Sequence, residues 1–287
     1  MNMNIEQVLP ELPESQATGQ IREIYDDIKY LSAVPMVALI YRHMATLPGV
    51  LEWAWEVLRP LMVSGLLQEK GWQLARTADL PQTLAIPLKA RQAAGISATD
   101  EAIIASSLAA FNRTNPINIL SLRCLERHLR GAVAAGARAN PRAWTAPASL
   151  PRLPAMLEPG DMNPAARDIV DWLSHRGQGR YAGIWPSLYR YLAHVPPYLG
   201  FAAVILPPHF DGIDRAVTML NADIEKAADE LAAQVPPPKL AAPTAGTRDK
   251  LERAIGNFTM LIPEMLVIGT LLERATVAND GEVSRMG

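Results

Sequence analysis

The chain has 287 residues, 49% apolar and 20% charged, and at roughly 100–200 residues per domain this predicts two domains or two halves of one. A net charge of −2 provides no basic surface for nucleic acid, and the single cysteine, Cys124, excludes an internal disulfide and fits a reducing compartment. No apolar run approaches the ~20 residues of a membrane span, and the N-terminus lacks the pattern of a signal peptide. We therefore expect a cytoplasmic protein that binds neither nucleic acid nor a membrane.

The composition favours helices throughout the chain. Ala, Leu and Met recur at helical spacing, no stretch shows sustained alternation of β-branched and polar residues, and 24 prolines punctuate the pattern. Ser97 and Asp100 have the spacing of a capping box, and Pro116 suits the first turn of a separate helix. The fold class is all-α, and helices of the first half are predicted at 19–31, 37–47, 50–66, 97–111 and 116–130.

The sequence repeats itself once. Tyr41-Arg42 returns 148 positions later as Tyr189-Arg190, and Phe111 and Pro116 return 147 positions later as Phe258 and Pro263. Matches in the same order at a nearly constant offset predict a duplicated unit of about 145 residues. We expect two pseudo-symmetric helical halves, residues 1–137 and 164–287, joined by a Pro-rich linker, residues 138–163.

Four short motifs carry a resemblance to a known family. They are Val-Pro-x-Val-Ala at Val34–Ala38, Ala-Thr-x-Pro-Gly at Ala45–Gly49, Trp-Ala-Trp at Trp53–Trp55 and Phe-Asn-x-x-Asn-Pro at Phe111–Pro116. In these motifs and in its duplicated arrangement the chain resembles the group I, non-stereospecific 2-haloacid dehalogenases. The resemblance implies an all-α fold with the active site between two related halves. It also implies hydrolysis of the carbon–halogen bond of short 2-haloalkanoic acids, without a metal or an organic cofactor, by a water that an aspartate activates and that inverts the stereocentre.

The family's catalytic pair is only half present. Its serine and aspartate lie just before the Ala-x-x-Pro of the second half, and alignment through Ala193 and Pro196 places Ser187 and Leu188 there. No Asp or Glu occurs between Asp171 and Asp211, so a one-residue shift supplies no acid. Because a positioned base typically contributes ~10²–10⁴-fold, we expect dehalogenation to be weak or lost.

The family's pocket residues are also partly replaced. Its tryptophan after Val-Pro corresponds to Met36, its phenylalanine to Leu39, and a tyrosine of a late helix falls near Asn257, whereas the asparagine before proline is kept as Asn115. The resemblance thus predicts a binding site for a small carboxylic acid. Its predicted residues are Met36, Leu39, Asn115, Ser187, Leu188 and Asn257.

Other side chains are weaker candidates for chemistry. His194 could replace the missing base, although a lone histidine at a helix end is more often structural. One arginine of the repeated pairs, Arg42 or Arg190, could hold a substrate carboxylate through two parallel hydrogen bonds, or both could pair with carboxylates at the helix surface.

Two further functions remain open. One is a noncatalytic homologue that binds a small acid or serves a structural role. The other is a helical redox protein similar to the AhpD-like alkylhydroperoxidases, because Ser121, Cys124 and His128 have the spacing of their Cys-x-x-Cys-x-x-x-His motif. Since the first thiol is a serine, a buried structural cysteine is the better interpretation. Histidines at metal-ligand spacing are lacking, and a homodimer is one option for the oligomeric state.

Overall fold

The computed structural model describes residues 9–131, 144–175 and 183–277, and in this part of the chain every regular element is helical. This confirms the predicted all-α class. The helices are α1 (Gly19–Ser32), α2 (Leu39–Met44), α3 (Val50–Val63), α4 (Leu66–Thr77), α5 (Leu88–Ala93), α6 (Ala98–Leu129), α7 (Pro164–Ser174), α8 (Ser187–Leu192), α9 (Pro196–Ile205), α10 (Phe210–Ala232) and α11 (Ala245–Val277), with short 3-10 turns at Glu14–Gln16, Pro159–Asp161 and Pro207–His209.

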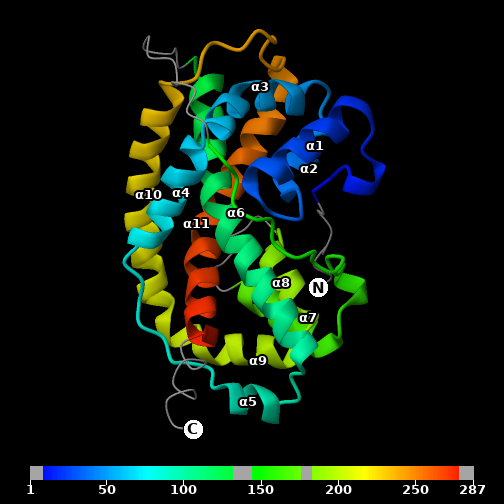
Figure 1. The fold of residues 1–287 in the computed structure, drawn as a ribbon, viewed down its shortest axis with the longest axis vertical. Coiled ribbons are helices and arrows are strands. Elements are labelled where there is room, and N and C mark those ends of the chain that lie inside the picture. The colour runs from blue at the N-terminus through cyan, green and yellow to red at the C-terminus, as the bar shows by residue number, and fades with distance from the viewer. Residues whose placement is uncertain (1–8, 132–143, 176–182, 278–287) are drawn as a thin grey trace, which may run out of the picture.

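Two long helices, α6 and α11, pack against each other through the middle of the molecule (Figure 1). Helices α4 and α10 cover one flank of this pair, while α1 to α3 lie at one end and α7 to α9 at the other. The short helices cross between the halves: α2 of the first half contacts α11 of the second, and α8 of the second contacts α6 of the first. The space between the halves is therefore enclosed by four helices, two from each half.

Helix α6 begins as predicted but does not end where predicted. The Ser97 hydroxyl accepts a hydrogen bond from the Asp100 backbone N–H at 3.2 Å, and the Asp100 carboxylate accepts one from the Ser97 N–H at 2.9 Å. The helix then continues through Pro116, so the expectation of two helices, 97–111 and 116–130, is wrong. An internal proline costs about 3 kcal/mol, and the buried inner face of this long helix offsets that cost.

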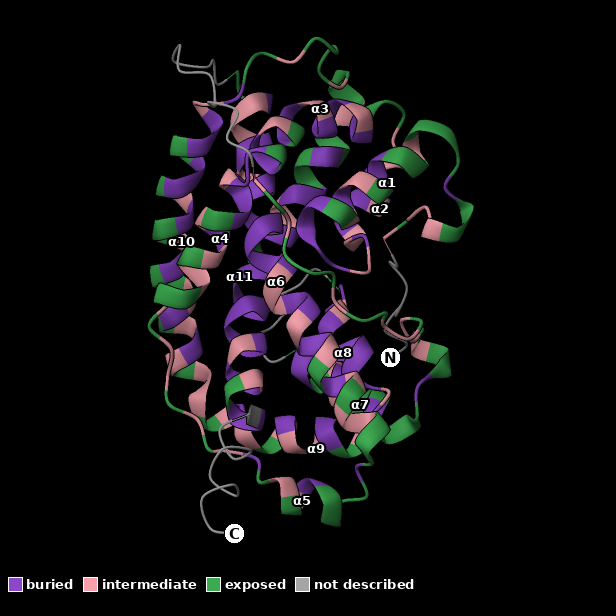
Figure 2. Ribbon diagram, in the orientation of Figure 1, coloured by how far each residue is buried: buried purple, intermediate pink, exposed green. Residues whose placement is uncertain are grey.

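Helix α11 has an internal proline too, Pro263, and it is long and apolar enough to cross a membrane by length and composition. Of its most apolar stretch, 78% is buried among the other helices, as expected for a core helix (Figure 2). The apolar side chains of both halves form one continuous core around α6 and α11.

The corresponding segments of the predicted repeat share their secondary structure. Helices α2 and α8 are each six residues long and begin 148 positions apart, and Pro116 and Pro263 lie inside the two long helices, 147 positions apart. This is the minimum that a duplication requires, and the duplication itself stays a prediction. The proposed boundary at residues 137 and 138 lies outside the described residues.

The described part of the linker, from residue 144 onward, is extended and hydrogen-bonded to both halves. Arg113 of α6 donates to the Ala148 carbonyl at 2.8 Å, and Arg190 of α8 donates to the Leu157 carbonyl at 2.8 Å. The linker is therefore bonded both to α6, in the middle of the molecule, and to α8, near one end.

Candidate functional site

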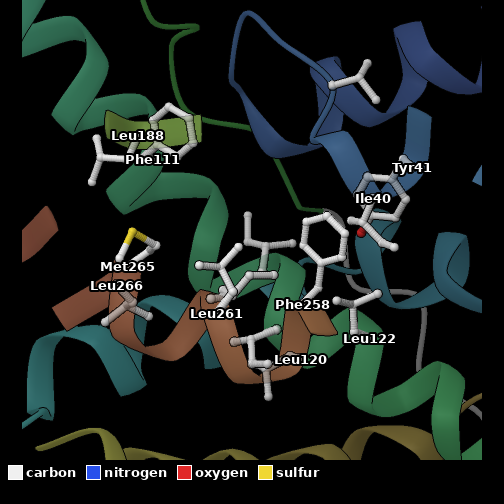
Figure 3. Close-up of a cluster of buried hydrophobic side chains, with 14 of the residues drawn as sticks. Ile40, Tyr41, Phe111, Leu120, Leu122, Leu188, Phe258, Leu261, Met265 and Leu266 are labelled. Carbon is white, nitrogen blue, oxygen red and sulfur yellow. The ribbon is translucent and has the colours of Figure 1, made fainter. Parts of the chain in front are cut away.

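A cavity of about 60 Å³ lies between the two halves, where α2, α6, α8 and α11 meet. At about 10–15 Å³ per water this space holds several waters, or one small organic molecule in their place. Five of the lining residues, Ile40, Phe111, Leu188, Leu261 and Met265, are labelled in Figure 3 among the buried hydrophobic side chains. The full lining is Met36, Val37, Ala38, Leu39, Ile40, Arg42, Phe111, Thr114, Asn115, Asn118, Met156, Pro186, Ser187, Leu188, Tyr191, Phe258, Leu261, Ile262 and Met265.

Five of the residues predicted for the site line this cavity together: Met36, Leu39, Asn115, Ser187 and Leu188. They come from three segments that are far apart in the sequence, so only the fold brings them together.

The other two predicted residues do not line the cavity. Asn257 is half-buried on α11 and stands one position before Phe258, which does line it. Consecutive helical residues point about 100° apart, so a shift of one position turns the side chain away. His194 lies outside the cavity, with its Nε2 atom 2.8 Å from the Ala155 carbonyl oxygen. It thus has the structural role that the sequence allowed for.

The two long helices give the cavity two different walls. Helix α6 contributes Phe111, Thr114, Asn115 and Asn118, and α11 contributes residues at the same spacing, which is that of one helix face. Three of the four side chains on α6 are polar, whereas all four on α11 are apolar. The members of the α11 wall are Phe258, Leu261, Ile262 and Met265.

Asn115 is the polar group of this wall that lacks a partner. Its side chain is 6% exposed, and its Nδ2 atom is buried without a hydrogen-bond acceptor among the described residues. A buried donor left unsatisfied costs about 1–3 kcal/mol, so such a group in a native structure needs an explanation. A ligand in the cavity that accepts this hydrogen bond would supply one.

Leu188, which the sequence alignment places at the aspartate of the family that the chain resembles, is fully buried. It lies against α11: a Cβ atom placed on Gly269 would stand 3.5 Å from Leu188 Cδ2. Asn112 of α6 closes this corner, since its Nδ2 donates to the Gly269 carbonyl at 3.2 Å and to Glu273 Oε2 at 2.8 Å. Among the described residues that line the cavity there is no carboxylate and no imidazole. At the position that the resemblance predicts for the general base, the cavity thus has a methyl-tipped side chain.

The two arginines of the repeat, which are equivalent in the sequence, have different surroundings in the structure. Arg42 lines the cavity, and its Nε lies 2.9 Å from Glu11 Oε2. Arg190 does not line it, because its Nε donates to the Leu157 carbonyl and its Nη2 pairs with Glu158 at 2.7 Å. Both arginines pair with carboxylates, as the second interpretation of the sequence predicted, but only one of them borders the cavity.

Tyr191 borders the cavity beside Phe111, with the two ring centres 5.6 Å apart. Burial raises the pKa of the Tyr191 hydroxyl, and the positive charge of Arg42 opposes this rise. Tyr191 is therefore neutral at pH 7 and can donate a hydrogen bond, and it lies close enough to Arg42 to feel its charge.

The thiol of Cys124 is fully buried in α6, away from the cavity lining, and its Sγ lies 3.8 Å from the Ala228 carbonyl. Burial raises the pKa of this thiol to about 12, so it stays protonated at neutral pH. A redox cysteine reacts as the thiolate, and this environment therefore gives the AhpD-like interpretation no support.

Among the lining residues that sequence reasoning missed, the polar ones are Thr114, Asn118 and Tyr191. A signal for two of them was present, because Thr114 adjoins Asn115 and Asn118 follows it by three positions on the same helix. Tyr191 stands four positions after Ser187, which is again one helical turn.

Comparison with known proteins gives relatives of one kind. The chain is 28% identical over 205 residues to a configuration-inverting 2-haloacid dehalogenase of Pseudomonas sp. (strain 113), covering 67% of this chain and 64% of that enzyme. It is 29% identical over 133 residues to a second such enzyme, from Alcaligenes xylosoxydans xylosoxydans, covering 46% of this chain and 45% of the enzyme. The aligned region spans less than two thirds of either relative. No protein-family model matches the chain.

Solved structures share the whole fold. A crystal structure of a D-2-haloacid dehalogenase mutant superposes with a TM-score of 0.73 at 19% identity, covering 93% of this chain and 96% of that one. Complexes of a D-2-haloacid dehalogenase mutant with D-2-CPA and of a D-2-haloacid dehalogenase with L-LA match with the same TM-score and identity. The chain therefore has the all-helical fold of these dehalogenase structures.

Proposed function

We propose that this protein is a divergent member of the 2-haloacid dehalogenase family whose cavity binds a short 2-substituted carboxylic acid and hydrolyses its carbon–halogen bond weakly or not at all. Two relatives of 28% and 29% identity and the shared fold support the family. The observation that carries the proposal is the cavity itself, where Asn115, Ser187 and Leu188 meet and no carboxylate stands among the described lining residues.

The chemistry explains why the missing carboxylate matters. In an inverting hydrolysis the water oxygen bonds to carbon 2 as the halide leaves with the electron pair of the carbon–halogen bond. The water must lose a proton to give the 2-hydroxy acid, and a neighbouring base accepts it in the transition state. Leu188 cannot accept a proton, and Ser187 beside it is not basic at neutral pH. The cavity can thus bind a small acid and shield it from bulk water, but its described lining residues include no group that activates water.

The motifs favour the non-stereospecific group I, whereas the structural neighbours are named as D-2-haloacid dehalogenases. We propose group I because the Val-Pro, Ala-Thr-x-Pro-Gly and Phe-Asn-x-x-Asn-Pro motifs occur in order. The two enantiomers of 2-chloropropionate distinguish the assignments: group I ancestry predicts that both bind with similar affinity, and a D-specific pocket would bind one of them alone.

The test combines binding with turnover. Isothermal titration calorimetry should detect binding of 2-chloropropionate to the purified protein, while a chloride-release assay should show no turnover beyond the spontaneous rate. Robust chloride release would contradict the requirement for a base at position 188. Absence of binding at millimolar ligand would contradict the proposed function as a whole.

A further inference from the structure

Arg42 differs from its counterpart Arg190 in what its guanidinium can still bind. Within the described residues Arg42 has one ionic partner, Glu11, whose Oε2 lies 2.9 Å from Nε, but this Nε is buried without a hydrogen bond, and no partner of the two terminal nitrogens is found there. The side chain is only 16% exposed and forms part of the cavity wall. By contrast, Arg190 uses both its Nε and a terminal nitrogen for the linker. Arg42 is therefore the arginine with free donors at a cavity.

The N-terminal segment holds Arg42 in place. The Leu12 backbone N–H donates to the Arg42 carbonyl at 3.0 Å, the Tyr25 hydroxyl donates to the Leu12 carbonyl at 3.0 Å, and the neighbouring His43 Nδ1 lies 2.7 Å from the Pro10 carbonyl. These bonds fix the helix backbone and place Glu11 beside the guanidinium. An arginine fixed in this way loses little conformational freedom when a ligand binds.

The rest of the wall sets what the ligand carries besides an anionic group. Arg42 is the only side chain among the described lining residues that carries a charge at pH 7. The α11 wall opposite the polar α6 wall is apolar at Leu261, Ile262 and Met265. A ligand that satisfies both ends is a small carboxylate with an apolar substituent.

We propose that Arg42 binds the carboxylate of the ligand through its free terminal nitrogens, while the α11 wall receives the apolar substituent at carbon 2. The cavity is thereby selective for short aliphatic carboxylates over their neutral analogues. This inference rests on the proposed function, because it takes the cavity to be the ligand site, and it assigns the residue that recognises the acid.

Glu11 gives the proposal a prediction that a merely structural arginine would not make. Its carboxylate repels the incoming ligand, and a glutamine there has the same shape and keeps an oxygen beside the Arg42 Nε without the charge. Glu11→Gln should therefore tighten carboxylate binding about fivefold, since removing a like charge at close range favours the anion. A salt bridge needed only for folding would instead leave affinity unchanged or lower it.

The experiment titrates 2-chloropropionate and its neutral isostere 2-chloropropionamide into the full chain by calorimetry. Arg42→Gln should lower affinity for the acid roughly 10–100-fold, the usual range for a hydrogen bond to a charged group, and leave affinity for the amide unchanged. Arg190→Gln is the matched control, with acid affinity unchanged. If Arg42→Gln fails to fold because Glu11 is left unpaired, Glu11→Gln with Arg42→Gln removes both charges and should show the same loss.

The outcomes separate the two proposals. Binding of the acid by the unmodified protein, with equal affinity in Arg42→Gln or an equal loss in Arg190→Gln, would overturn the role of Arg42 and leave the proposed function standing. Failure of the unmodified protein to bind the acid at all would overturn both.

Discussion

Helices α6 and α11 have the same structural role, since each forms one long wall of the cavity. Both are long, both continue through an internal proline, and both present four residues at identical spacing to one cavity. They differ in the chemistry at those positions, since α6 offers an amide without a partner and α11 offers only apolar side chains. The framework of the cavity thus depends on helix length and packing, whereas the difference in polarity between its two long walls depends on a few side chains of α6.

The largest expected effect comes from placing a carboxylate at position 188, where α8 lies against α11. Leu188→Asp should allow chloride release from 2-chloropropionate, and it should lower the free energy of unfolding by roughly 3–4 kcal/mol because the new group is buried among apolar neighbours. Burial raises the pKa of the new aspartate. Only its ionised form accepts a proton, so the rate should rise with pH.

Leu188→Asn is the control for this variant, because it has the same shape and polarity without a base. Chloride-release assays across pH and denaturant unfolding of both variants check the prediction. Equal chloride release by the asparagine variant would show that a carboxylate at position 188 is not what the cavity lacks.

The next largest loss of stability should follow from placing an asparagine on α11 at the position that corresponds to Asn115 of α6. Ile262 stands at the α11 position that corresponds to Asn115 and is 5% exposed. Ile262→Asn should lower the free energy of unfolding by roughly 2–4 kcal/mol, since apolar burial is lost and an amide is left without partners. Ile262→Val, which keeps the wall apolar, should cost only about 1 kcal/mol. Similar costs for the two variants in chemical denaturation would mean that the α11 wall tolerates polarity.

The reverse change makes α6 like α11. Asn115→Leu removes the unsatisfied donor, so it should leave stability unchanged or raise it by about 1 kcal/mol, and it should weaken binding of 2-chloropropionate about tenfold. Asn257→Leu is the matched control, because this asparagine is half-buried on α11 outside the cavity. Calorimetry and denaturant unfolding together test the pair. Loss of stability without loss of binding in Asn115→Leu would show that the amide serves the fold.

The effect with the least influence at neutral pH concerns the thiol of Cys124. Cys124 lies in α6 where α11 carries Leu271, and burial raises the pKa of its thiol from 9.0 to about 12. The folded state therefore favours the neutral thiol, and its contribution is complete below pH 9 and lost as the pH rises from 9 towards 12. Above pH 9 this group should cost roughly 1.4 kcal/mol of stability per pH unit. Unfolding at pH 8 and pH 10.5 should show a shallower loss for Cys124→Ala than for the unmodified protein.

Composition and periodicity were sufficient for the fold class, because helical spacing of Ala and Leu does not depend on tertiary context. They failed at Pro116, since proline usually ends a helix and only the packing of α6 shows that it continues there. The resemblance supplied five cavity residues from motifs with fixed spacing.

The rest of the site depends on contacts between distant segments. Nothing local distinguishes Arg42 from Arg190, because the difference lies in Glu11 on the N-terminal segment and Glu158 on the linker. The alignment places a family residue near Asn257, whereas the next residue, Phe258, lines the cavity, and an alignment without a fixed helical phase does not distinguish two neighbouring positions.

The central claim is that this cavity binds a small acid and leaves its carbon–halogen bond intact for want of a base. A crystal structure after soaking with (S)-2-chloropropionate tests it most directly. We predict the intact ligand between α6 and α11, with its carboxylate on Arg42 and its chlorine still bonded to carbon 2. A 2-hydroxy acid in the cavity would contradict the account. So would a structure in which the cavity is empty and the ligand is bound elsewhere on the protein.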